Sequence, residues 1–463
     1  MNIPSTPEDA QEHRSQVRKV ALSGLLGTVL EYYDFLLYST MAALVFGDLF
    51  FPSANSAAST IAAFGTLAAG YAARPLGGVI FGHFGDKLGR KSMLIVTMVI
   101  MGGASFLIGL LPTYASIGVL APILLVTLRV VQGVAIGGEW GGAALMVIEH
   151  AESDRRGRWA GIMQLGSPLG FLFSTVVVMA VSLLPDESLY AWGWRIPFLI
   201  SGLLVVIGLY IRLSVVESPV FREAVETAAE TEPKTPLIQL LRRPRPLLLA
   251  CAAGIGPFAL TALATSHIIA YTKSIGYNQP DVMRALVAIS VLSLFAIPFF
   301  SALSDRVGRR AVMLTGATAT VLFALPMYAM VNTGSALWLT ISLMIAQIVQ
   351  NMMYAPLAPL LSEMFGTETR YTGVSLGYQM ASLIGAGFTP LIASSLLASS
   401  EGSSLMLSGI IVATASVTMV AVWRLSETRG RDLGSNFNAS APAHEAAADH
   451  IAYDDERPTS DLT

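Results

Sequence analysis

The sequence predicts an all-α integral membrane protein with twelve transmembrane helices in two pseudo-symmetric six-helix bundles. Apolar residues make up 54% of the 463 residues and charged residues only 13%, whereas a soluble protein carries about 25% charged residues. The mean hydropathy of +0.62 is typical of a chain that lies largely in lipid. The polar segment 82–91 recurs at 301–310 with the same spacing of Asp, Gly and Arg. This duplication predicts that the chain consists of two related halves.

Twelve apolar segments are long enough to cross a bilayer, which takes about 20 helical residues. Each copy of the duplicated polar segment lies between two of them, so we expect each copy to be a tight hairpin between neighbouring helices. The triplet 212–214 at the end of the first half also recurs, at 424–426. The predicted spans are centred on residues 20–46, 57–81, 92–111, 117–148, 159–184, 195–213, 246–272, 284–303, 311–331, 336–361, 371–397 and 404–425.

The distribution of basic residues predicts the orientation in the membrane. Most Lys and Arg residues fall in alternate loops, which the positive-inside rule places in the cytoplasm together with both termini. Together with the spans, this predicts a cytoplasmic N-terminal tail (1–19), an N-terminal bundle (20–214), a cytoplasmic linker (215–245), a C-terminal bundle (246–426) and a disordered cytoplasmic tail (427–463).

The chain lacks the sequence motifs of several other functions. A transport ATPase needs a glycine-rich phosphate loop that ends in Gly-Lys-Ser/Thr, and the sequence has none. An ion gradient is therefore the expected energy source. We find neither a cluster of metal ligands nor a nucleophile beside a base, so we expect no metal, no cofactor, no enzymatic activity and no nucleic-acid partner. Cys251 is the only cysteine, which excludes an internal disulfide.

Several motifs resemble those of a known family. The two hairpins and the glycine-rich segment 129–142 resemble signature segments of the major facilitator superfamily. The segments Glu31–Phe35, Arg74–Gly78, Trp194–Phe198 and Glu217–Phe221 resemble a narrower family within it, the metabolite:proton symporters, and this resemblance covers about residues 18–430. One departure is Tyr32, where this family usually has Trp, and we expect the change to adjust the pocket rather than the mechanism.

The resemblance implies a fold and a function. Members of the family carry shikimate, α-ketoglutarate, citrate, proline or betaine, and the segment 370–379 looks closest to the shikimate-type branch. We therefore expect the major facilitator fold and a secondary active transporter that imports a small organic acid by proton symport with alternating access. The expected partners are the organic anion, the proton and the lipid bilayer, and we expect a functional monomer in the bacterial inner membrane.

The alternatives to this function are an osmolyte symporter, a metabolite exporter and a membrane sensor. A symporter of zwitterionic osmolytes such as proline or betaine often adds a C-terminal coiled coil, and we see no heptad pattern in the tail. Metabolite exporters of the superfamily usually carry a Gly-Pro motif in the fifth span, whereas the segment 161–170 has glycines without that pair. A membrane sensor that binds a metabolite without transport would usually carry a long soluble signalling segment.

Charged residues inside the apolar spans are costly to bury and are therefore candidates for proton coupling. Asp34 lies roughly 22 Å and Arg129 roughly 30 Å from the cytoplasmic edge at 1.5 Å per residue, a gap that helix tilt and long side chains can close. The resemblance to sugar–proton symporters, which pair an Asp of span one with an Arg of span four, favours this pair. Protonation of Asp34 would free Arg129 for an anionic substrate. The expected proton-coupling residues are Asp34, Arg129, Glu31 and Glu139; the alternative is that they only hold the helices together.

Polar residues elsewhere in the spans are candidates for the substrate pocket. Gln347, Asn351 and Tyr354 are spaced by four and three residues, so they share one helical face. The alternative for each candidate is an interhelical hydrogen bond, which is common in membranes. The expected substrate-binding residues are Arg129, Tyr32, Tyr33, Gln164, Gln347, Asn351, Tyr354, Tyr378 and Gln379.

The duplicated hairpins predict a gate at the cytoplasmic end. Their charged residues can pair with charged residues at the ends of spans four and ten when the transporter faces outward, and separate when it faces inward. The alternative is that they only anchor the topology. The expected gating residues are Asp86, Arg90, Glu149 and Arg158 in the first half, and Asp305, Arg309, Glu363 and Arg370 in the second.

Overall fold

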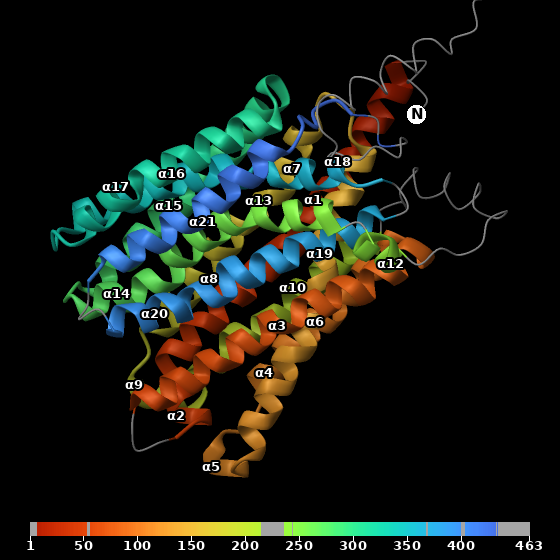
Figure 1. The fold of residues 1–463 in the computed structure, drawn as a ribbon. Coiled ribbons are helices and arrows are strands. Elements are labelled where there is room, and N and C mark those ends of the chain that lie inside the picture. The colour runs from red at the N-terminus through yellow and green to blue at the C-terminus, as the bar shows by residue number, and fades with distance from the viewer. Residues whose placement is uncertain are drawn as a thin grey trace, which may run out of the picture.

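The computed structural model of the protein describes residues 7–52, 56–213, 236–242, 244–366, 369–399, 403–431 and 433. These residues form helices and connecting turns, without a strand. Eleven of the described helices are long and apolar enough to cross a membrane. The remaining long helix, α3 (Ser56–Leu88), is rich in Ala and Gly and holds Arg74, which makes it less apolar. Together they form the predicted twelve-helix fold, drawn as long, roughly parallel rods in Figure 1.

The first half of the chain supplies six of these rods. Its first helix contains a π-helical turn, η1, which joins two α-helical parts, and its fifth helix is interrupted at Leu165. The elements are α1 (Pro7–Met41), η1 (Ala42–Phe46), α2 (Gly47–Phe50), α3, α4 (Arg90–Leu110), α5 (Tyr114–Ile117), α6 (Leu120–His150), α7 (Arg156–Gln164), α8 (Gly166–Val181), α9 (Asp186–Ser188), η2 (Leu189–Gly193) and α10 (Arg195–Leu213).

The second half repeats this plan. Its first rod again contains a π-helical turn, η3, at the corresponding stage of the bundle. The elements are α12 (Pro236–Arg242), α13 (Pro244–Ala262), η3 (Leu263–His267), α14 (Ile268–Ser274), α15 (Gln279–Val307), α16 (Arg309–Val331), α17 (Ala336–Tyr354), α18 (Leu357–Met364), α19 (Arg370–Ser382), η4 (Leu383–Phe388), α20 (Thr389–Ser399) and α21 (Leu405–Arg424).

The two predicted hairpins have the same backbone conformation. Gly89 joins α3 to α4 with φ 98° and ψ 149°, and Gly308 joins α15 to α16 with φ 103° and ψ 153°. Only glycine adopts such angles readily. The duplicated Gly is therefore needed for the turn in both halves. We call the end of the bundle at which these glycines lie the hairpin end, and the opposite end, with α5 and α14, the far end.

The halves meet along two pairs of helices. α3 packs against α19, and α15 packs against α7 and α8. Within the first half, α3 and α6 approach so closely that a Cβ at Gly77 would collide with the carbonyl of Val134, and one at Gly137 with the carbonyl of Arg74. Small residues allow such close packing of membrane helices.

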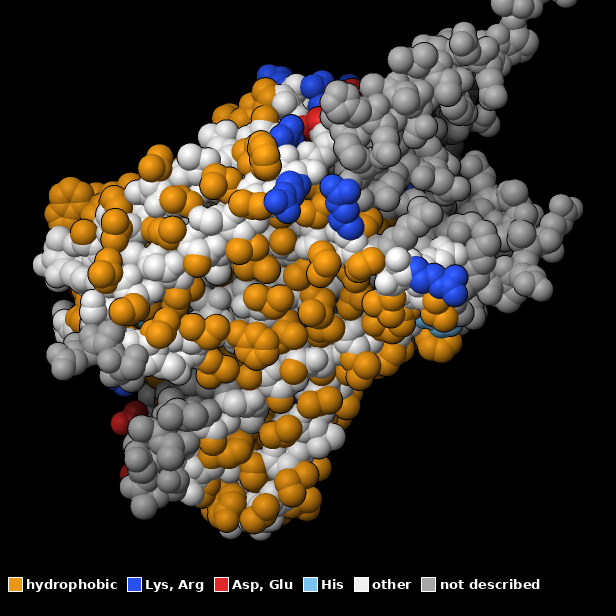
Figure 2. All heavy atoms as spheres, in the orientation of Figure 1, with side chains coloured by type: hydrophobic (Ala, Val, Ile, Leu, Met, Phe, Trp, Pro, Cys, Tyr) orange, Lys and Arg blue, Asp and Glu red, His pale blue; other side chains and the backbone are white. Residues whose placement is uncertain are grey.

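The flank of the bundle is apolar, as a lipid-facing surface must be. Large side chains such as Leu203 and Tyr210 on α10, and Phe295 on α15, are exposed there. Figure 2 shows this flank covered by hydrophobic side chains, with Lys and Arg side chains gathered near the hairpin end.

The boundaries of the predicted domains stay predictions, but the structure corrects two details. α1 begins at Pro7, so most of the predicted N-terminal tail is helical. The predicted disordered tail starts too early, because residues 427–431 and 433 pack against the hairpin end, as described below. Residues 214–235, which make up most of the predicted linker, and residues 434–463 lie outside the described residues.

Candidate functional site

A central cavity lies between the two halves and has two lobes. The larger lobe holds about 570 Å³ of space between atoms, part of it open to solvent. Its wall on the second half is polar but uncharged: Gln347 donates hydrogen bonds to Gln350 (3.1 Å) and Asn351 (3.4 Å), and Asn351 donates to Ser293 (3.1 Å). The lobe extends from Tyr32 and Tyr354 towards the far end, where Thr175, Thr265 and Leu286 line it.

The smaller lobe has about 400 Å³ of space between atoms, part of it open to solvent, and shares Tyr32 and Phe171 with the larger one. It is lined by the charged residues Glu31 and Arg74, together with Tyr378 and Ser382. The central cavity therefore has an uncharged polar part and a charged part, and Tyr32 borders both.

Three tyrosines join the halves at the floor of the cavity. The Tyr32 hydroxyl lies 3.0 Å from the Tyr354 hydroxyl and 3.3 Å from the Tyr378 hydroxyl. The Tyr378 ring stacks on Trp140, with 3.5 Å between centroids. Tyr354, Tyr378 and Trp140 are nearly or fully buried, and Tyr32 is half-buried. They separate the cavity from the hairpin end in this conformation.

The first of three buried ion pairs in the middle of the described spans is Asp34–Arg129, which joins α1 to α6. Arg129 Nη1 lies 3.0 Å from Asp34 Oδ2, and the guanidinium lies over the Tyr38 ring at 3.6 Å. Gln132 Nε2 donates to Asp34 Oδ2 and Ser105 Oγ to Asp34 Oδ1, both at 2.5 Å. Asp34 is 3% and Arg129 5% exposed. The pair is enclosed within the first half and lines neither lobe of the cavity.

The second pair, Glu31–Arg74, joins α1 to α3 and borders the smaller lobe. Arg74 Nη1 lies 3.4 Å from Glu31 Oε1, and the guanidinium lies 4.0 Å from the centre of the Tyr71 ring. Glu31 Oε2 is buried without a hydrogen-bond partner. This pair is therefore held by fewer contacts than Asp34–Arg129.

The third pair, Glu139–Arg212, lies nearer the hairpin end and joins α6 to α10. Arg212 Nη2 lies 2.6 Å from Glu139 Oε1. Thr97 Oγ1 donates to Glu139 Oε2 (2.5 Å), and Arg212 Nη1 donates to the Leu94 carbonyl (2.8 Å). A small crevice lined by Arg212, Lys91 and Ser23 approaches this pair. Among the described residues, all three ion pairs in the middle of the spans belong to the first half.

A pseudo-symmetric network of ion pairs closes the hairpin end. In the first half Arg90 Nη1 lies 2.7 Å from Glu149 Oε2, and Glu149 Oε1 lies 3.6 Å from Arg370 Nη1 of the second half. In the second half Arg309 Nε lies 3.6 Å from Glu363 Oε2, and Glu363 Oε1 lies 3.6 Å from Arg156 Nη1 of the first half. Each buried glutamate thus pairs with the hairpin arginine of its own half and with an arginine of the other half.

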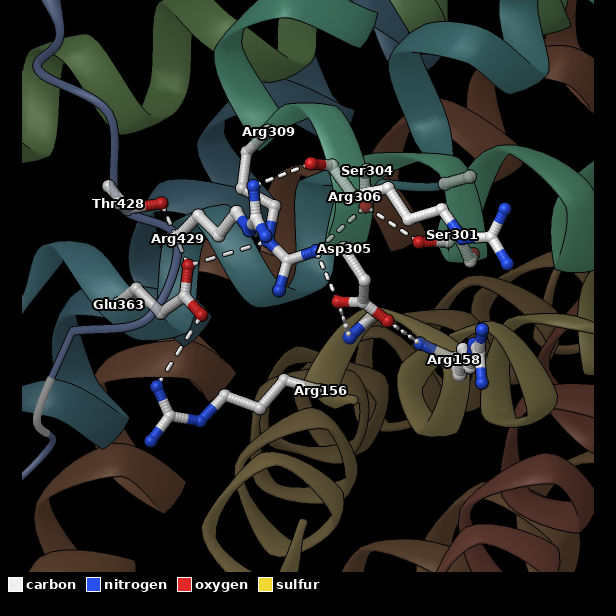
Figure 3. A network of polar contacts seen from close by, with 12 residues as sticks. Arg156, Arg158, Ser301, Ser304, Asp305, Arg306, Arg309, Glu363, Thr428 and Arg429 are labelled. Atoms are coloured by element: carbon white, nitrogen blue, oxygen red, sulfur yellow. Dashed lines mark hydrogen bonds and ion pairs between the residues drawn. The ribbon is translucent and has the colours of Figure 1, made fainter. Parts of the chain in front are cut away.

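Asp305 adds a second link between the halves, shown in Figure 3. Its carboxylate accepts hydrogen bonds from the backbone N–H groups of Gly157 (2.8 Å) and Arg158 (2.9 Å), at the start of α7. It also pairs with Arg309 Nη1 at 2.6 Å. A Cβ at Gly157 would lie 2.6 Å from Asp305 Oδ1, so this approach requires glycine.

The segment after α21, which we call the C-terminal strap (426–431 and 433), crosses the network. Glu427 accepts hydrogen bonds from the backbone N–H groups of Arg309 (2.9 Å) and Arg310 (3.1 Å), and Thr428 Oγ1 donates to Glu363 (2.8 Å; Figure 3). Arg156 of the first half donates to the Arg431 carbonyl at 2.6 Å. Burial lowers the pKa of Arg431 to about 10, at which it remains charged at neutral pH. The strap therefore contacts both halves.

Comparison with known proteins identifies the family. The sequence profile described as Major Facilitator Superfamily matches residues 24–376 and 268–449. The chain belongs to the major facilitator superfamily. Its fold is also that of the proton:xylose symporter XylE bound to 6-bromo-6-deoxy-D-glucose, with a TM-score of 0.73 at 16% identity over 91% of this chain and 98% of that one.

The curated relatives within the superfamily are bacterial transporters. The shikimate transporter of Escherichia coli strain K12 is 42% identical over 399 residues, which are 85% of this chain and 91% of the relative. The inner membrane metabolite transport protein YhjE of the same strain is 36% identical over 94% of this chain and all of the relative (100%). The proline/betaine transporter of Salmonella typhimurium strain LT2 is 32% identical over 93% of this chain and 88% of the relative. The protein is therefore a multi-pass membrane transporter of small molecules.

The structure brings only some of the predicted substrate residues of this transporter to the cavity. Tyr33 instead donates to the Pro197 carbonyl (2.6 Å), because the next position along a helix points about 100° away from Tyr32. Gln164 donates to the Ala355 carbonyl (2.9 Å), and Gln379 to the Ile136 carbonyl (3.3 Å), across the interface of the halves. Arg129 lines neither lobe. The predicted residues that do line the cavity are Tyr32, Gln347, Asn351, Tyr354 and Tyr378.

The predicted gating residues lie at the hairpin end, but Arg158 contributes differently from the prediction and the side chain of Asp86 is not described. The exposed Arg158 contributes its backbone N–H, whereas Arg156 supplies the buried guanidinium that reaches Glu363. The side chain of Asp86 lies outside the described residues. The prediction missed Gln350, which lines the cavity and shares the helical face of Gln347 and Tyr354. It also missed that Glu31 pairs with Arg74 and that Glu139 pairs with Arg212.

Proposed function

We propose that the protein imports a small organic acid of the shikimate type by proton symport with alternating access. The observation that carries this proposal is a difference between the two walls of the cavity. Among the described residues, the ion pairs in the middle of the spans lie in the first half, while the cavity wall of the second half offers uncharged polar groups. The shikimate transporter, at 42% identity, supports the substrate class.

Asp34 is the proposed proton acceptor. Its carboxylate lies 3.0 Å from the guanidinium of Arg129. Protonation removes the negative charge of this carboxylate and weakens the contact with Arg129, so α1 and α6 can move relative to each other. Because Arg129 lies outside the cavity lining, its proposed part is to hold Asp34, and we no longer assign it to the substrate. Glu31 and Glu139 stay proposed members of the same proton pathway.

Alternating access requires that the hairpin end open while the far end closes. The ion-pair network and the Asp305 contacts hold the hairpin end shut in this conformation, and the proposed transport cycle breaks them when the substrate and the proton are bound. We further propose that the protein works as a monomer in a bacterial inner membrane, with the hairpin end and both termini in the cytoplasm.

Uptake of radiolabelled shikimate into cells that lack their own shikimate uptake tests the substrate class. We expect accumulation that an excess of unlabelled shikimate abolishes and that a proton ionophore collapses. The second candidate substrate is a zwitterionic osmolyte, favoured by the 32% identity to the proline/betaine transporter. Accumulation of betaine but not shikimate would replace the first proposal by the second.

A further inference from the structure

Glu31–Arg74 is the one ion pair of the described spans that borders the central cavity. Both side chains line the smaller lobe, next to Tyr32, which also borders the larger lobe. Asp34–Arg129 is enclosed within the first half, and Glu139–Arg212 lies beside a separate crevice. A substrate in the central cavity can therefore reach the guanidinium of Arg74 and neither of the other two.

The Glu31–Arg74 contact is also the most easily exchanged of the three. Its N–O distance of 3.4 Å is longer than the 3.0 Å and 2.6 Å of the other pairs. Asp34 also accepts hydrogen bonds from Gln132 and Ser105, whereas Glu31 Oε2 has no partner. A carboxylate held by one long contact can be replaced by another carboxylate at small cost.

The charge of Glu31 depends on Arg74 for its partner. Asp34 on α1 and Glu139 on α6 are both close enough to interact with it electrostatically, and Arg74 on α3 is the cation that opposes them. The remaining titratable groups of the lobe are the hydroxyls of Tyr32, Tyr71 and Tyr378. Asp34 and Glu139 are paired with arginines of their own, so Arg74 is the one cation that pairs with Glu31 among the described residues.

We propose that Arg74 binds the carboxylate of the substrate, and that this carboxylate displaces Glu31, which then holds the cotransported proton. This assignment rests on the proposed proton symport. The proton comes from the medium at the far end, and it leaves Glu31 when the hairpin end opens. No covalent bond other than the O–H bond of the carboxyl group forms or breaks.

Charge balance explains why the substrate and the proton travel together. The empty site holds Glu31 as an anion and Arg74 as a cation. The loaded site holds neutral Glu31, cationic Arg74 and an anionic substrate, so its net charge is again zero. Substrate without a proton would leave an uncompensated negative charge in a buried site, which is costly. A proton without substrate would leave Arg74 unpaired, which is equally unfavourable.

Binding of shikimate and of its methyl ester to the purified full-length protein tests the assignment. The ester keeps the ring and the hydroxyls but lacks the charge. We expect wild-type protein to prefer shikimate, and Arg74→Gln to lose on the order of 10- to 100-fold of its affinity for shikimate while its affinity for the ester changes less than about threefold. Arg195→Gln is the control, because Arg195 binds the Leu111 carbonyl away from the cavity, and we expect it to keep the wild-type preference.

Glu31→Gln gives an independent test that does not depend on the folding of the Arg74 variant. Because glutamine cannot compete as an anion for Arg74, we expect shikimate to bind at least as tightly as in wild type and to lose its pH dependence, while proton-driven accumulation in liposomes fails. Weaker shikimate binding in Glu31→Gln, or an unchanged preference in Arg74→Gln, overturns the assignment and leaves the proposed function standing. Wild-type protein that does not bind shikimate overturns the proposed substrate class, and the assignment with it.

Discussion

The side chains around Asp34 determine what its substitution should do. Asn has the size of Asp and can still meet Gln132 and Ser105, but it can neither accept a proton nor pair with Arg129 as an anion. We predict that Asp34→Asn abolishes accumulation of shikimate against its gradient while exchange of internal for external shikimate survives in part. Parallel measurement of net uptake and counterflow in liposomes checks this.

The control for Asp34→Asn is Asp48→Asn. Asp48 is exposed at the far end, where it accepts a hydrogen bond from the hydroxyl of half-buried Tyr190 (3.1 Å), so its loss should leave accumulation near the wild-type rate. Wild-type accumulation by Asp34→Asn would remove Asp34 from the proton pathway and leave it as a residue that holds α1 to α6.

At the scale of residues, it was easier to predict from the sequence which charged side chains lie within the spans than which residues they pair with. Asp34, Arg129, Glu31 and Glu139 are recognisable because a charge in an apolar span is rare. The choice of Arg74 as the partner of Glu31 depends on the rotation of α3 about its axis, which the sequence does not encode locally. For the same reason Arg156 could not be distinguished from Arg158, two positions away.

Among the helices, the proposed gate lies where α15 meets α7. Asp305, on the last turn of α15, holds two N–H groups of α7 and the Arg309 side chain. Both carboxylate oxygens of Asp305 accept hydrogen bonds, and Asn would replace one of these oxygens by an amide N–H₂ group, which cannot accept. We predict that Asp305→Asn shifts the equilibrium towards the state that is open at the hairpin end by about 1–3 kcal/mol, or roughly 5- to 150-fold.

Alkylation of a cysteine in the cavity reports this shift. In a Cys251→Ser background, Ser290→Cys places a thiol in the larger lobe, and a membrane-impermeant maleimide added to intact cells reaches it only from the far end. We expect slower alkylation in Asp305→Asn. Asp281→Asn on the first turn of the same helix is the matched control, because its pair with exposed Arg284 contributes little. Equal rates in all three proteins would show that Asp305 does not hold the gate.

The elements were predictable because their signals are local. The length of the apolar segments predicted the spans. The repeated spacing of Asp and Gly-Arg predicted the two hairpins, whose glycines adopt nearly identical backbone angles. The interruption of the first helix of each half by a π-helical turn, and the ordered C-terminal strap, were not predicted. Both depend on contacts between segments far apart in the chain, such as Glu427 with the start of α16.

For the whole molecule, pairing one proton with one monoanion makes the transported charge zero. A proton gains about 2.3 kcal/mol per 100 mV on entry, and a monoanion loses the same amount. The pH gradient and consumption of the substrate should therefore drive uptake, with little contribution from the membrane potential. The neutral net charge of the site in both its empty and its loaded states agrees with this stoichiometry.

Simultaneous measurement of shikimate and proton flux into liposomes tests proton-coupled import most directly. The pH gradient is imposed with the interior alkaline, and the potential is clamped with valinomycin and potassium. We predict accumulation with about one proton per shikimate, at a rate that falls to the passive level when an ionophore removes the gradient and that changes little when only the potential is varied. Shikimate entry that is indifferent to the pH gradient, or that brings no protons with it, would contradict proton symport.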